Sequence, residues 1–249
     1  MSIVCKSAGE IEKMRRSGRI LRQVIDAITP LAQPGATTMD LERATLKKLK
    51  ELGAKAAFKG LYDYPCALCT SVNEEVVHGI PSDRRVLKNG DILSIDFGVL
   101  HDGYYSDSAL TLPIGEISEE CAKLIRVTRE SLELGLAEAK IGATLGDIGA
   151  AVQEHAESNG FSVVREYVGH GIGSRLHEDP QIPNYGRRGH GTKLREGMVL
   201  AIEPMINAGL AAVRELADKW TVVTADGRPS AHYEHTVAVT KDGPVILTD

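Results

Sequence analysis

Two apolar stretches of this chain each run into an acidic residue, and this pattern is the first sign of chemistry. GDILSIDFG (90–98) places Asp96 after an apolar run, and GMVLAIEPM (197–205) places Glu203 in the same position. A carboxylate at the end of a buried strand is costly unless another group compensates its charge. The two stretches therefore predict a pair of strands that bring acids to a site where a cation can bind.

Another acid, Asp107, is predicted to lie beside Asp96 on a β-hairpin. The turn signal HDG (101–103) separates two runs with strand character. A two-residue loop at the first two positions of this turn pairs Asp107 with Asp96. A loop at the last two positions pairs Asp107 with Gly98 and leaves Asp96 as its diagonal neighbour on the same face. Like charges this close are tolerable when they share a proton or hold a cation.

The second half of the chain supplies an analogous set of candidate ligands. Glu203 ends its strand, Glu234 lies in AHYEHTVAVT, and His170 lies in the loop-like GHGIG. With Asp96 and Asp107 this gives four carboxylates and one imidazole, which suits two divalent ions because four negative charges balance them. Some carboxylates must then bridge, and two metals about 3.5–4 Å apart are a known arrangement for hydrolysis. The alternative is that the five residues make unrelated salt bridges and helix caps.

An internal repeat accounts for the equivalent placement of the acids. A shift of 107 positions (203 − 96) superimposes Asp96 on Glu203 and also superimposes residues 35–37 on residues 142–144, both Gly-Ala-Thr. Two similar halves imply a pseudo-twofold axis. The site is therefore expected where the halves meet.

The two halves differ in where their histidines fall. His78 in EEVVHGI matches His170 in EYVGHGI at a shift of 92 (170 − 78), which is 15 fewer than 107. We therefore expect two extra segments on a common core, Ala56–Ser71 in the first half and Arg175–His190 in the second. The repeat alone leaves open which of the two histidines is a metal ligand.

Helical periodicity and capping signals predict two helices in each half. Ser7-x-x-Glu10 resembles a capping box, and Gly53 and Gly160 stand where C-cap glycines occur. The pattern is typical of an α+β protein with a mostly antiparallel sheet inside and helices outside. The first expected helix starts at Ser7 and ends before Pro30, and the other three span 38–52, 118–139 and 144–159. The expected strands span 92–99, 104–112, 199–203, 220–224 and 232–240.

Size and composition limit the class of protein. The 249 residues are 43% hydrophobic, and no linker divides them, so we expect one catalytic domain, 1–249, made of two related halves, about 7–112 and 117–241. The net charge of −5 argues against a general affinity for nucleic acid. The N-terminus has no apolar h-region and no apolar run approaches a membrane span, so neither a signal peptide nor a membrane segment is expected.

The cysteines favour a reducing compartment. Of the four, only Cys66 and Cys69 are close in sequence, and no second C-x-x-C pair accompanies them. This excludes the usual pattern of a structural zinc site and does not match a redox dithiol that opens a helix. We therefore expect a cytoplasmic protein.

At these residues the sequence resembles the methionine aminopeptidases of the short type I form. The resemblance covers nearly the whole chain and is most specific in NEEVVHGIP, LSIDFGVLHDGYYSDSA, VREYVGHGIGSRLHEDP, EPM-x-N-A-G and AHYEHTVAV. The order Asp, Asp with ten residues between, His, Glu, Glu matches the metal ligands of the wider pita-bread family. The resemblance implies the pita-bread fold, whose pseudo-twofold core agrees with the repeat.

The resemblance also implies a role for each candidate ligand. Asp96 would chelate one of two divalent ions (Co, Mn, Fe or Zn), and His170 and Glu203 would hold the other. Asp107 and Glu234 would bridge the two. A water between the metals would attack the carbonyl that follows the first residue of the substrate, with Glu203 as the proton shuttle.

Two further histidines receive roles from the resemblance. His78, matched to His170 by the repeat, would contact the substrate amide without binding metal. His177 in SRLHEDP would donate a hydrogen bond to the scissile carbonyl as negative charge develops there. The remaining histidines are expected to be structural, at the surface or on the other strand face: His101, His155, His190, His232 and His235.

The pocket for the first substrate residue is expected to be apolar and narrow enough for an unbranched thioether. Tyr64 and Cys69 lie in the first extra segment and Leu176 in the second, so these segments are expected to form the pocket walls. The candidates are Tyr64, Cys69, His78 and Trp220, with Phe58, Leu61 and Leu176 at positions where the family varies.

The predicted function is metal-dependent removal of the initiator methionine from nascent polypeptides, with preference for a small second residue. A monomer is expected. A transient ribosome contact is left open, although no basic tail argues for it. Xaa-Pro aminopeptidases and prolidases share the metal set but usually carry an N-terminal domain for which the early first helix leaves no room. The type II insertion is absent between His170 and Glu203, and non-catalytic relatives that bind peptides characteristically lose ligands.

Overall fold

The computed structural model describes residues 3–249. Its helices are α1 (Ala8–Ile28), α2 (Thr38–Glu51), α3 (Glu119–Ala137) and α4 (Leu145–Ser158), with short 3-10 turns η1 (Thr29–Leu31) and η2 (Leu61–Asp63). The four predicted helices are confirmed to within a few residues at each end. Among the described residues, no helix combines the length and the apolar character needed to cross a membrane.

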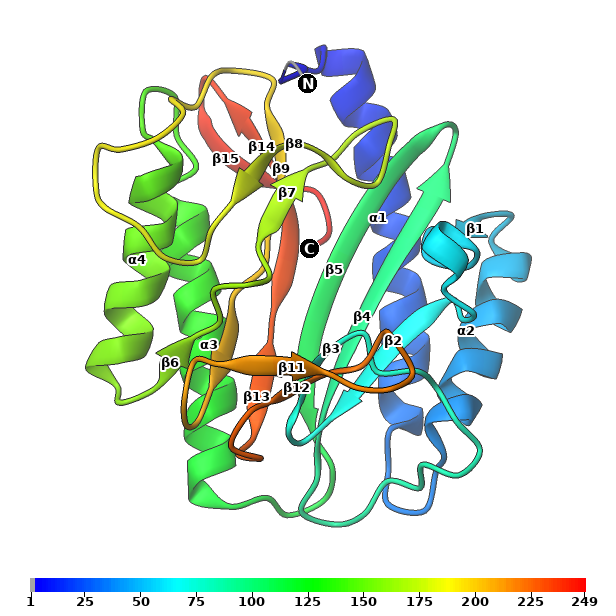
Figure 1. Ribbon diagram of the computed structural model, residues 1–249. Helices are drawn as coiled ribbons and strands as arrows, with labels where there is room; N and C mark the ends of the chain where they lie inside the picture. Colours follow the sequence, from blue (N-terminus) through cyan, green and yellow to red (C-terminus); the bar gives the residue numbers. More distant parts are fainter. Residues whose placement is uncertain (1–2) are drawn as a thin grey trace.

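One nine-stranded antiparallel sheet forms the body of the molecule (Figure 1). Its strands follow the order β1-β4-β5-β14-β9-β7-β8, while β2 also pairs with β4 and β15 with β14. Two three-stranded sheets, β13-β10-β6 and β11-β12-β3, complete the strand set. The strands are β1 (Lys55–Ala56), β2 (Leu68–Val72), β3 (Glu75–Val77), β4 (Ile92–His101), β5 (Tyr104–Pro113), β6 (Ser162–Val163), β7 (Gly169–Gly171), β8 (Glu178–Ile182), β9 (Val199–Ile202), β10 (Met205–Asn207), β11 (Val213–Glu215), β12 (Val222–Thr224), β13 (Ser230–His232), β14 (Glu234–Thr240) and β15 (Gly243–Ile246).

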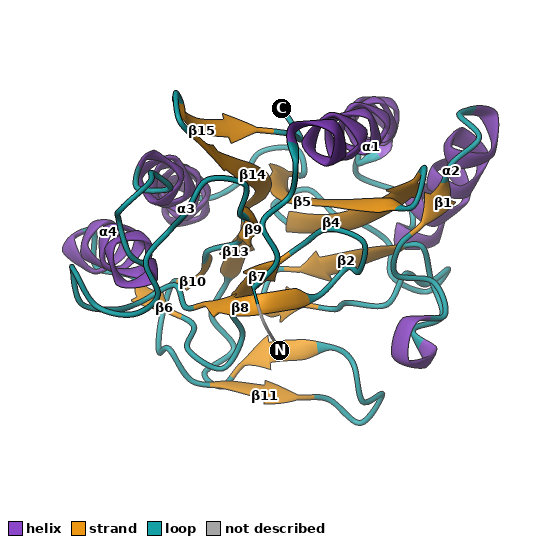
Figure 2. Cartoon of the chain, turned by 90° about the horizontal axis from the view of Figure 1, so that it is seen from above, coloured by secondary structure: helices purple, strands orange, loops and turns teal. Residues whose placement is uncertain are grey.

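The helices cover one side of the main sheet, and the small sheet that contains β11 lies on the other side (Figure 2). Ile95, Phe97 and Val99 of β4 belong to the core cluster that also contains residues of α1 and α2. Because side chains alternate along a strand, Asp96 points away from this cluster. The hydrophobic packing of the helices thus determines which face of the sheet receives the acids.

The repeat of 107 positions reappears in the hydrogen bonds of the two halves. Thr37 pairs with Val86 in an isolated β-bridge, and Thr144 pairs with Lys193 (37 + 107 = 144; 86 + 107 = 193). The helices α2 and α4 start and end 107 positions apart, and each begins at a capping box. The strands β4 and β9 also begin 107 positions apart. These equivalences place the central β5–β14 pair at the junction of the halves.

The hairpin register follows the second of the two predicted alternatives. His101 pairs with Tyr104, so the two-residue loop is Asp102-Gly103, and both loop residues have a positive φ. Asp107 therefore faces Gly98, and the alternative that paired Asp107 with Asp96 is wrong. The choice is consistent with a tight hairpin turn, which needs left-handed backbone that Asp and Gly adopt more readily than His.

Two predicted strands are shorter or divided. The strand expected at 220–224 begins only at Val222. The strand expected at 232–240 is interrupted at Tyr233, because His232 pairs with Met205 in one sheet while Glu234 pairs with Ala109 in another. The chain changes sheets at this break, which alternation of residue types does not signal.

The sheet register also corrects the pairing of His78 with His170. His170 on β7 lies opposite Ala201 of β9, and the position 107 residues before Ala201 is Ser94. Ser94 lies opposite Ser71 of β2. The structural counterpart of His170 is therefore Ser71, whereas His78 follows β3 in a separate turn. The segments EEVVHGI and EYVGHGI are alike only locally, since each has Glu four positions before a His-Gly-Ile triplet.

Candidate active site

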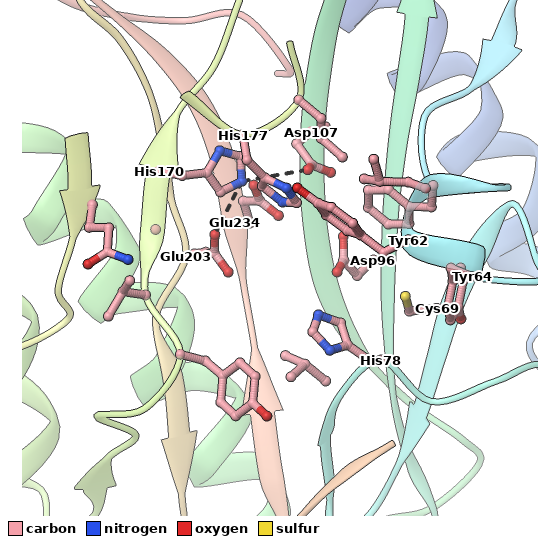
Figure 3. Close-up of a pocket in the computed structure, with 18 of the residues that line it drawn as sticks. Tyr62, Tyr64, Cys69, His78, Asp96, Asp107, His170, His177, Glu203 and Glu234 are labelled. Carbon is pink, nitrogen blue, oxygen red and sulfur yellow. Dashed lines mark ion pairs between the residues drawn. The ribbon is translucent and has the colours of Figure 1, made fainter. Parts of the chain in front are cut away.

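A cavity of about 480 Å³ opens on the face of the sheet opposite the helices, and residues from both halves line it. All five candidate ligands contribute to its lining, and the labelled side chains converge from β4, β5, β7 and β14 and the ends of neighbouring strands (Figure 3). They are Asp96, Asp107, His170, Glu203 and Glu234.

The seam between β5 and β14 brings two of the acids together. Asp107 lies on β5, and its backbone N–H donates to the Thr236 hydroxyl at 3.0 Å while that hydroxyl donates to the Asp107 carbonyl at 2.8 Å. Ser108 donates from its hydroxyl to the Glu234 carbonyl at 2.8 Å. These cross-strand bonds fix the backbone of both acids, which are 3% and 2% exposed respectively.

Burial and mutual repulsion disfavour the ionised form of all four carboxylates. Burial is the main cause that raises the pKa of Asp96 to about 7 and that of Glu203 to about 8. It also raises the pKa of Asp107 and of Glu234 well above the usual range, and neighbouring carboxylates raise both further. Four acids this close need protons or cations to be stable together.

His170 is held in the form that can bind a metal. Its Nδ1 donates to the Gly171 carbonyl at 2.9 Å, so its Nε2 carries the free lone pair in the neutral ring. That Nε2 lies 3.9 Å from Asp107 Oδ2 and 3.6 Å from Glu203 Oε1. Burial lowers the pKa of His170 to about 3, which keeps the imidazole neutral.

The donor set fits a divalent metal centre. One ligand atom each from Asp107, His170 and Glu234 lie within 4.8 Å of one another. Asp96 Oδ1 and Glu234 Oε1 are buried without a hydrogen-bond partner among the described residues. A bound metal ion would supply the partner that these buried carboxylate oxygens lack in the protein.

The wall of the cavity is apolar where the sequence predicts it. Tyr64, Cys66 and Cys69 form a buried cluster against which Phe58 and Trp220 pack. The Tyr64 and Trp220 rings meet edge to face at 5.0 Å between centroids. Every pocket candidate lines the cavity, namely Phe58, Leu61, Tyr64, Cys69, His78, Leu176 and Trp220.

Two further histidines face the cavity, His177 next to His170 and His78 below Asp96 in Figure 3. The His177 ring meets the His170 ring edge to face at 4.5 Å between centroids. His78 adopts a left-handed backbone conformation (φ 61°) and lies edge to face with Trp220. Burial is the main cause that lowers the pKa of His78 to about 4 and also lowers that of His177, so both rings are neutral near pH 7 and can donate hydrogen bonds.

Residues 12–241 match the model of metallopeptidase family M24. This chain belongs to that family. It is 52% identical over 246 residues to a methionine aminopeptidase of Clostridium acetobutylicum, covering 99% of this chain and 98% of the relative. It is also 52% identical to methionine aminopeptidase 1 of Bacillus subtilis, covering 99% of each chain. The crystal structure of a Thermotoga maritima methionine aminopeptidase matches with a TM-score of 0.98 and 48% identity, covering 100% of both chains.

The M24 match confirms the predicted pita-bread fold, with its antiparallel sheet and outer helices. The relatives confirm the resemblance to methionine aminopeptidases on which the site assignments rest. Part of the cavity lining was nevertheless not predicted. The additional lining residues are Tyr62, Val77, Tyr167, Val168, Gly169, Arg175, Glu178, Asp179, Gln181 and Met205. Several of them are neighbours of His170 or His177 in the sequence, and this adjacency could have indicated that they line the cavity.

His232 was expected to be structural or at the surface. It is not at the surface, because it is 1% exposed, and its Nε2 lies 3.7 Å from Glu203 Oε2. It ends β13, and the change of sheet at Tyr233 separates it from Glu234 on β14. His235 lies on the other face as expected and bonds Thr248 Oγ1 at 2.9 Å.

Proposed function

We propose that this chain is a metal-dependent aminopeptidase that removes the N-terminal methionine from nascent proteins and peptides, preferring a small second residue. The observation that carries the proposal is the convergence of two buried carboxylates, two partly buried carboxylates and one neutral imidazole in a cavity with an apolar wall. The related methionine aminopeptidases share at least half of the residues over nearly the full chain.

The proposed metal centre holds two divalent ions. Asp96 would bind one ion, and His170 with Glu203 would bind the other. Asp107 and Glu234 would bridge them, which agrees with their near-complete burial at the β5–β14 seam. Mixed carboxylate and imidazole ligation suits Mn, Fe, Co and Zn. Divalent ions bound here would supply an activated water nucleophile and polarise the scissile carbonyl.

The chain's own residues would bind and orient the substrate. The wall formed by Tyr64, Cys69 and Trp220 would hold the unbranched methionine side chain away from water. His78 and His177, both neutral, would donate hydrogen bonds to the substrate amide and to the scissile carbonyl oxygen. Glu203 would accept the proton of the attacking water at a carboxylate oxygen and deliver it to the leaving amine nitrogen.

The same proposal covers the state of the protein in the cell. We propose that residues 1–249 act as one catalytic domain and that the protein works as a cytoplasmic monomer. Its partner is the N-terminus of a nascent polypeptide, met through a transient contact with the ribosome. No specific nucleic acid and no membrane takes part in this proposal.

A peptide assay on metal-stripped protein tests the function. The substrates are Met-Ala-Ser, Met-Lys-Ser, Leu-Ala-Ser and Ala-Pro-Ser, each with and without Mn(II) or Co(II). We expect metal-dependent release of methionine from Met-Ala-Ser alone. Cleavage of Ala-Pro-Ser instead would keep the metal centre and assign the chain to the proline-specific branch. Metal binding with no cleavage of any peptide would favour a module that only binds peptides.

A further inference from the structure

His232 has a fixed backbone and an unpartnered ring. Thr111 holds its backbone from both sides, since the Thr111 hydroxyl accepts from the His232 N–H and donates to the His232 carbonyl, each at 2.9 Å. The Thr111 hydroxyl is itself bonded to Ser94 at 2.8 Å. Both ring nitrogens of His232, by contrast, are buried without a hydrogen-bond partner among residues 3–249.

A buried imidazole with two unpartnered nitrogens has lost its hydrogen bonds to water. Leaving a buried polar atom unpaired costs about 1–3 kcal/mol. The charged groups close to the His232 ring are Glu203 and Asp96. His232 also interacts electrostatically with His78. Of these, Glu203 presents a carboxylate oxygen 3.7 Å from Nε2. A shift of about half an ångström would turn this contact into a hydrogen bond.

Glu203 lies between two imidazoles, with one oxygen toward each. Its Oε1 is 3.6 Å from Nε2 of His170, a proposed metal ligand, and its other oxygen, Oε2, is 3.7 Å from His232 Nε2. His170 is bound through Nδ1–H to the Gly171 carbonyl, so its Nε2 cannot donate to Glu203 in the neutral ring. The donor available to Glu203 at this place is therefore His232.

We propose that His232 is a positioning residue whose Nε2–H donates to Glu203 Oε2 and thereby directs Glu203 Oε1 toward the metal position. The inference rests on the proposed function, because it takes Glu203 as a metal ligand and proton carrier. Partners behind a metal ligand orient it, and removing one typically lowers metal affinity or activity 10–100-fold. His232 acts only through Glu203 and does not touch the substrate, since it does not line the cavity.

A matched pair of substitutions separates hydrogen bonding from volume. His232→Gln keeps an N–H donor, whereas His232→Met has the same length and no donor. Mn(II) affinity is measured by calorimetry, and kcat and KM are measured with Met-Ala-Ser. We expect His232→Met to lower Mn(II) affinity and kcat by about 10–100-fold with KM within twofold, and His232→Gln to stay within about fivefold of the unmodified protein. His235→Gln, on the other face of the strand, is the control.

Several outcomes would overturn the proposal. Equal losses in the Gln and Met variants would make ring volume, not the N–H, the important property. No loss in either variant would leave His232 without a role at Glu203. Complete loss of Mn(II) binding in the Met variant, with the fold retained by circular dichroism, would make His232 a ligand itself. The calorimetric readout still tests His232 if the unmodified protein cleaves no peptide, so failure of the proposed function is distinguishable.

A measurement on the unmodified protein, loaded with diamagnetic Zn(II) so that Glu203 is ionised, reads the protonation of the His232 ring nitrogens directly. Nitrogen-15 NMR of the histidine rings identifies which ring nitrogen carries the proton. His232 is assigned from the signals that disappear in His232→Gln. We expect the proton on Nε2. A proton found on Nδ1 would contradict the proposed hydrogen bond to Glu203.

Discussion

Gly98 lies directly across the β4–β5 ladder from Asp107, and no side chain could take its place without disturbing that carboxylate. A Cβ at this position would lie 2.8 Å from Ala57 Cβ, 2.9 Å from Phe58 Cε1 and 3.3 Å from Asp107 Oδ1. The absent side chain leaves room for both the carboxylate and the segment that carries the pocket wall.

The first prediction concerns Gly98→Ala. The added methyl group would displace Asp107 and Phe58, so we expect at least a 10-fold loss of kcat/KM with Met-Ala-Ser and about 1–3 kcal/mol of lost stability. Gly9→Ala, where nothing lies within 4 Å of a new Cβ, is the control for a Gly-to-Ala change. Unchanged activity in Gly98→Ala would show that the ladder can yield without moving Asp107.

Asp107→Asn is expected to separate stability from function. Without metal, the amide removes repulsion among buried carboxylates while its Oδ1 can still accept from the Ser108 N–H, as Asp107 does at 3.1 Å. The metal-free variant is therefore expected to be more stable by about 1–2 kcal/mol, to lose the stabilisation given by Mn(II), and to lose at least 100-fold in activity. Thermal unfolding with and without Mn(II) measures this. Asp102→Asn in the exposed turn is the control, and a less stable metal-free Asp107→Asn would contradict the repulsion argument.

The metal-free protein is expected to lose stability as the pH rises from 6.5 to 8.5. The folded pKa values of Asp96 and Glu203, about 7 and about 8, exceed their unfolded values. The contribution of these two carboxyls to the free energy of unfolding is therefore fully present below the unfolded pKa and is lost as the pH rises through the folded pKa. Burial lowers the pKa of His170 to about 3 and of His78 to about 4, so these groups oppose the trend only below about pH 6.5, the unfolded pKa. Urea unfolding is expected to show a decrease of about 1–3 kcal/mol over this range. Saturating Mn(II) is expected to abolish it, and a flat profile without metal would contradict the raised pKa values.

The buried pair of Lys6 and Glu178 ties the N-terminal segment to the strand that follows His177. Lys6 Nζ lies 2.7 Å from Glu178 Oε2, and the two side chains are 3% and 6% exposed. Lys6→Met would leave the Glu178 carboxylate, which still accepts from the Arg175 N–H, without its buried cation, so we expect a loss of about 3–5 kcal/mol in urea unfolding. The exposed pair of Arg43 and Asp83 provides the comparison, since Arg43→Met is expected to cost less than about 1 kcal/mol. Equal losses in the two variants would show that burial of the Lys6 pair does not matter.

Trp220→Ala tests the pocket wall. The Trp220 ring packs against Tyr64 and lies 6.2 Å from the His78 ring, so its removal would widen the space expected for the methionine side chain. We expect KM for Met-Ala-Ser to rise about 5–50-fold and the preference over Leu-Ala-Ser to fall, because lost apolar contact weakens binding by about 1–2 kcal/mol. The control is Tyr185→Ala, whose ring stacks with Arg165 outside the cavity. A change in kcat alone would place Trp220 in the chemistry and not in the pocket.

The sequence by itself determined the features that depend on neighbouring residues. The capping box at Ser7, the four helices and the acid at the end of each repeated strand follow from hydrogen bonds and side-chain alternation within a few residues. The 107-position repeat predicted that Asp96 and Glu203 hold equivalent positions, and the hairpin pattern placed Asp107 beside Asp96 in either register. These predictions needed only the local geometry of helices and strands.

Tertiary structure alone decided how distant segments meet. The register of β7 on β9 makes Ser71 and not His78 the counterpart of His170, and the change of sheet at Tyr233 turns His232 toward Glu203. Strand pairing between remote segments is set by the packing of the whole core, which offers many registers of similar local quality. Alternation within one strand says which residues share a face, but only the folded sheet says which strand lies next to it.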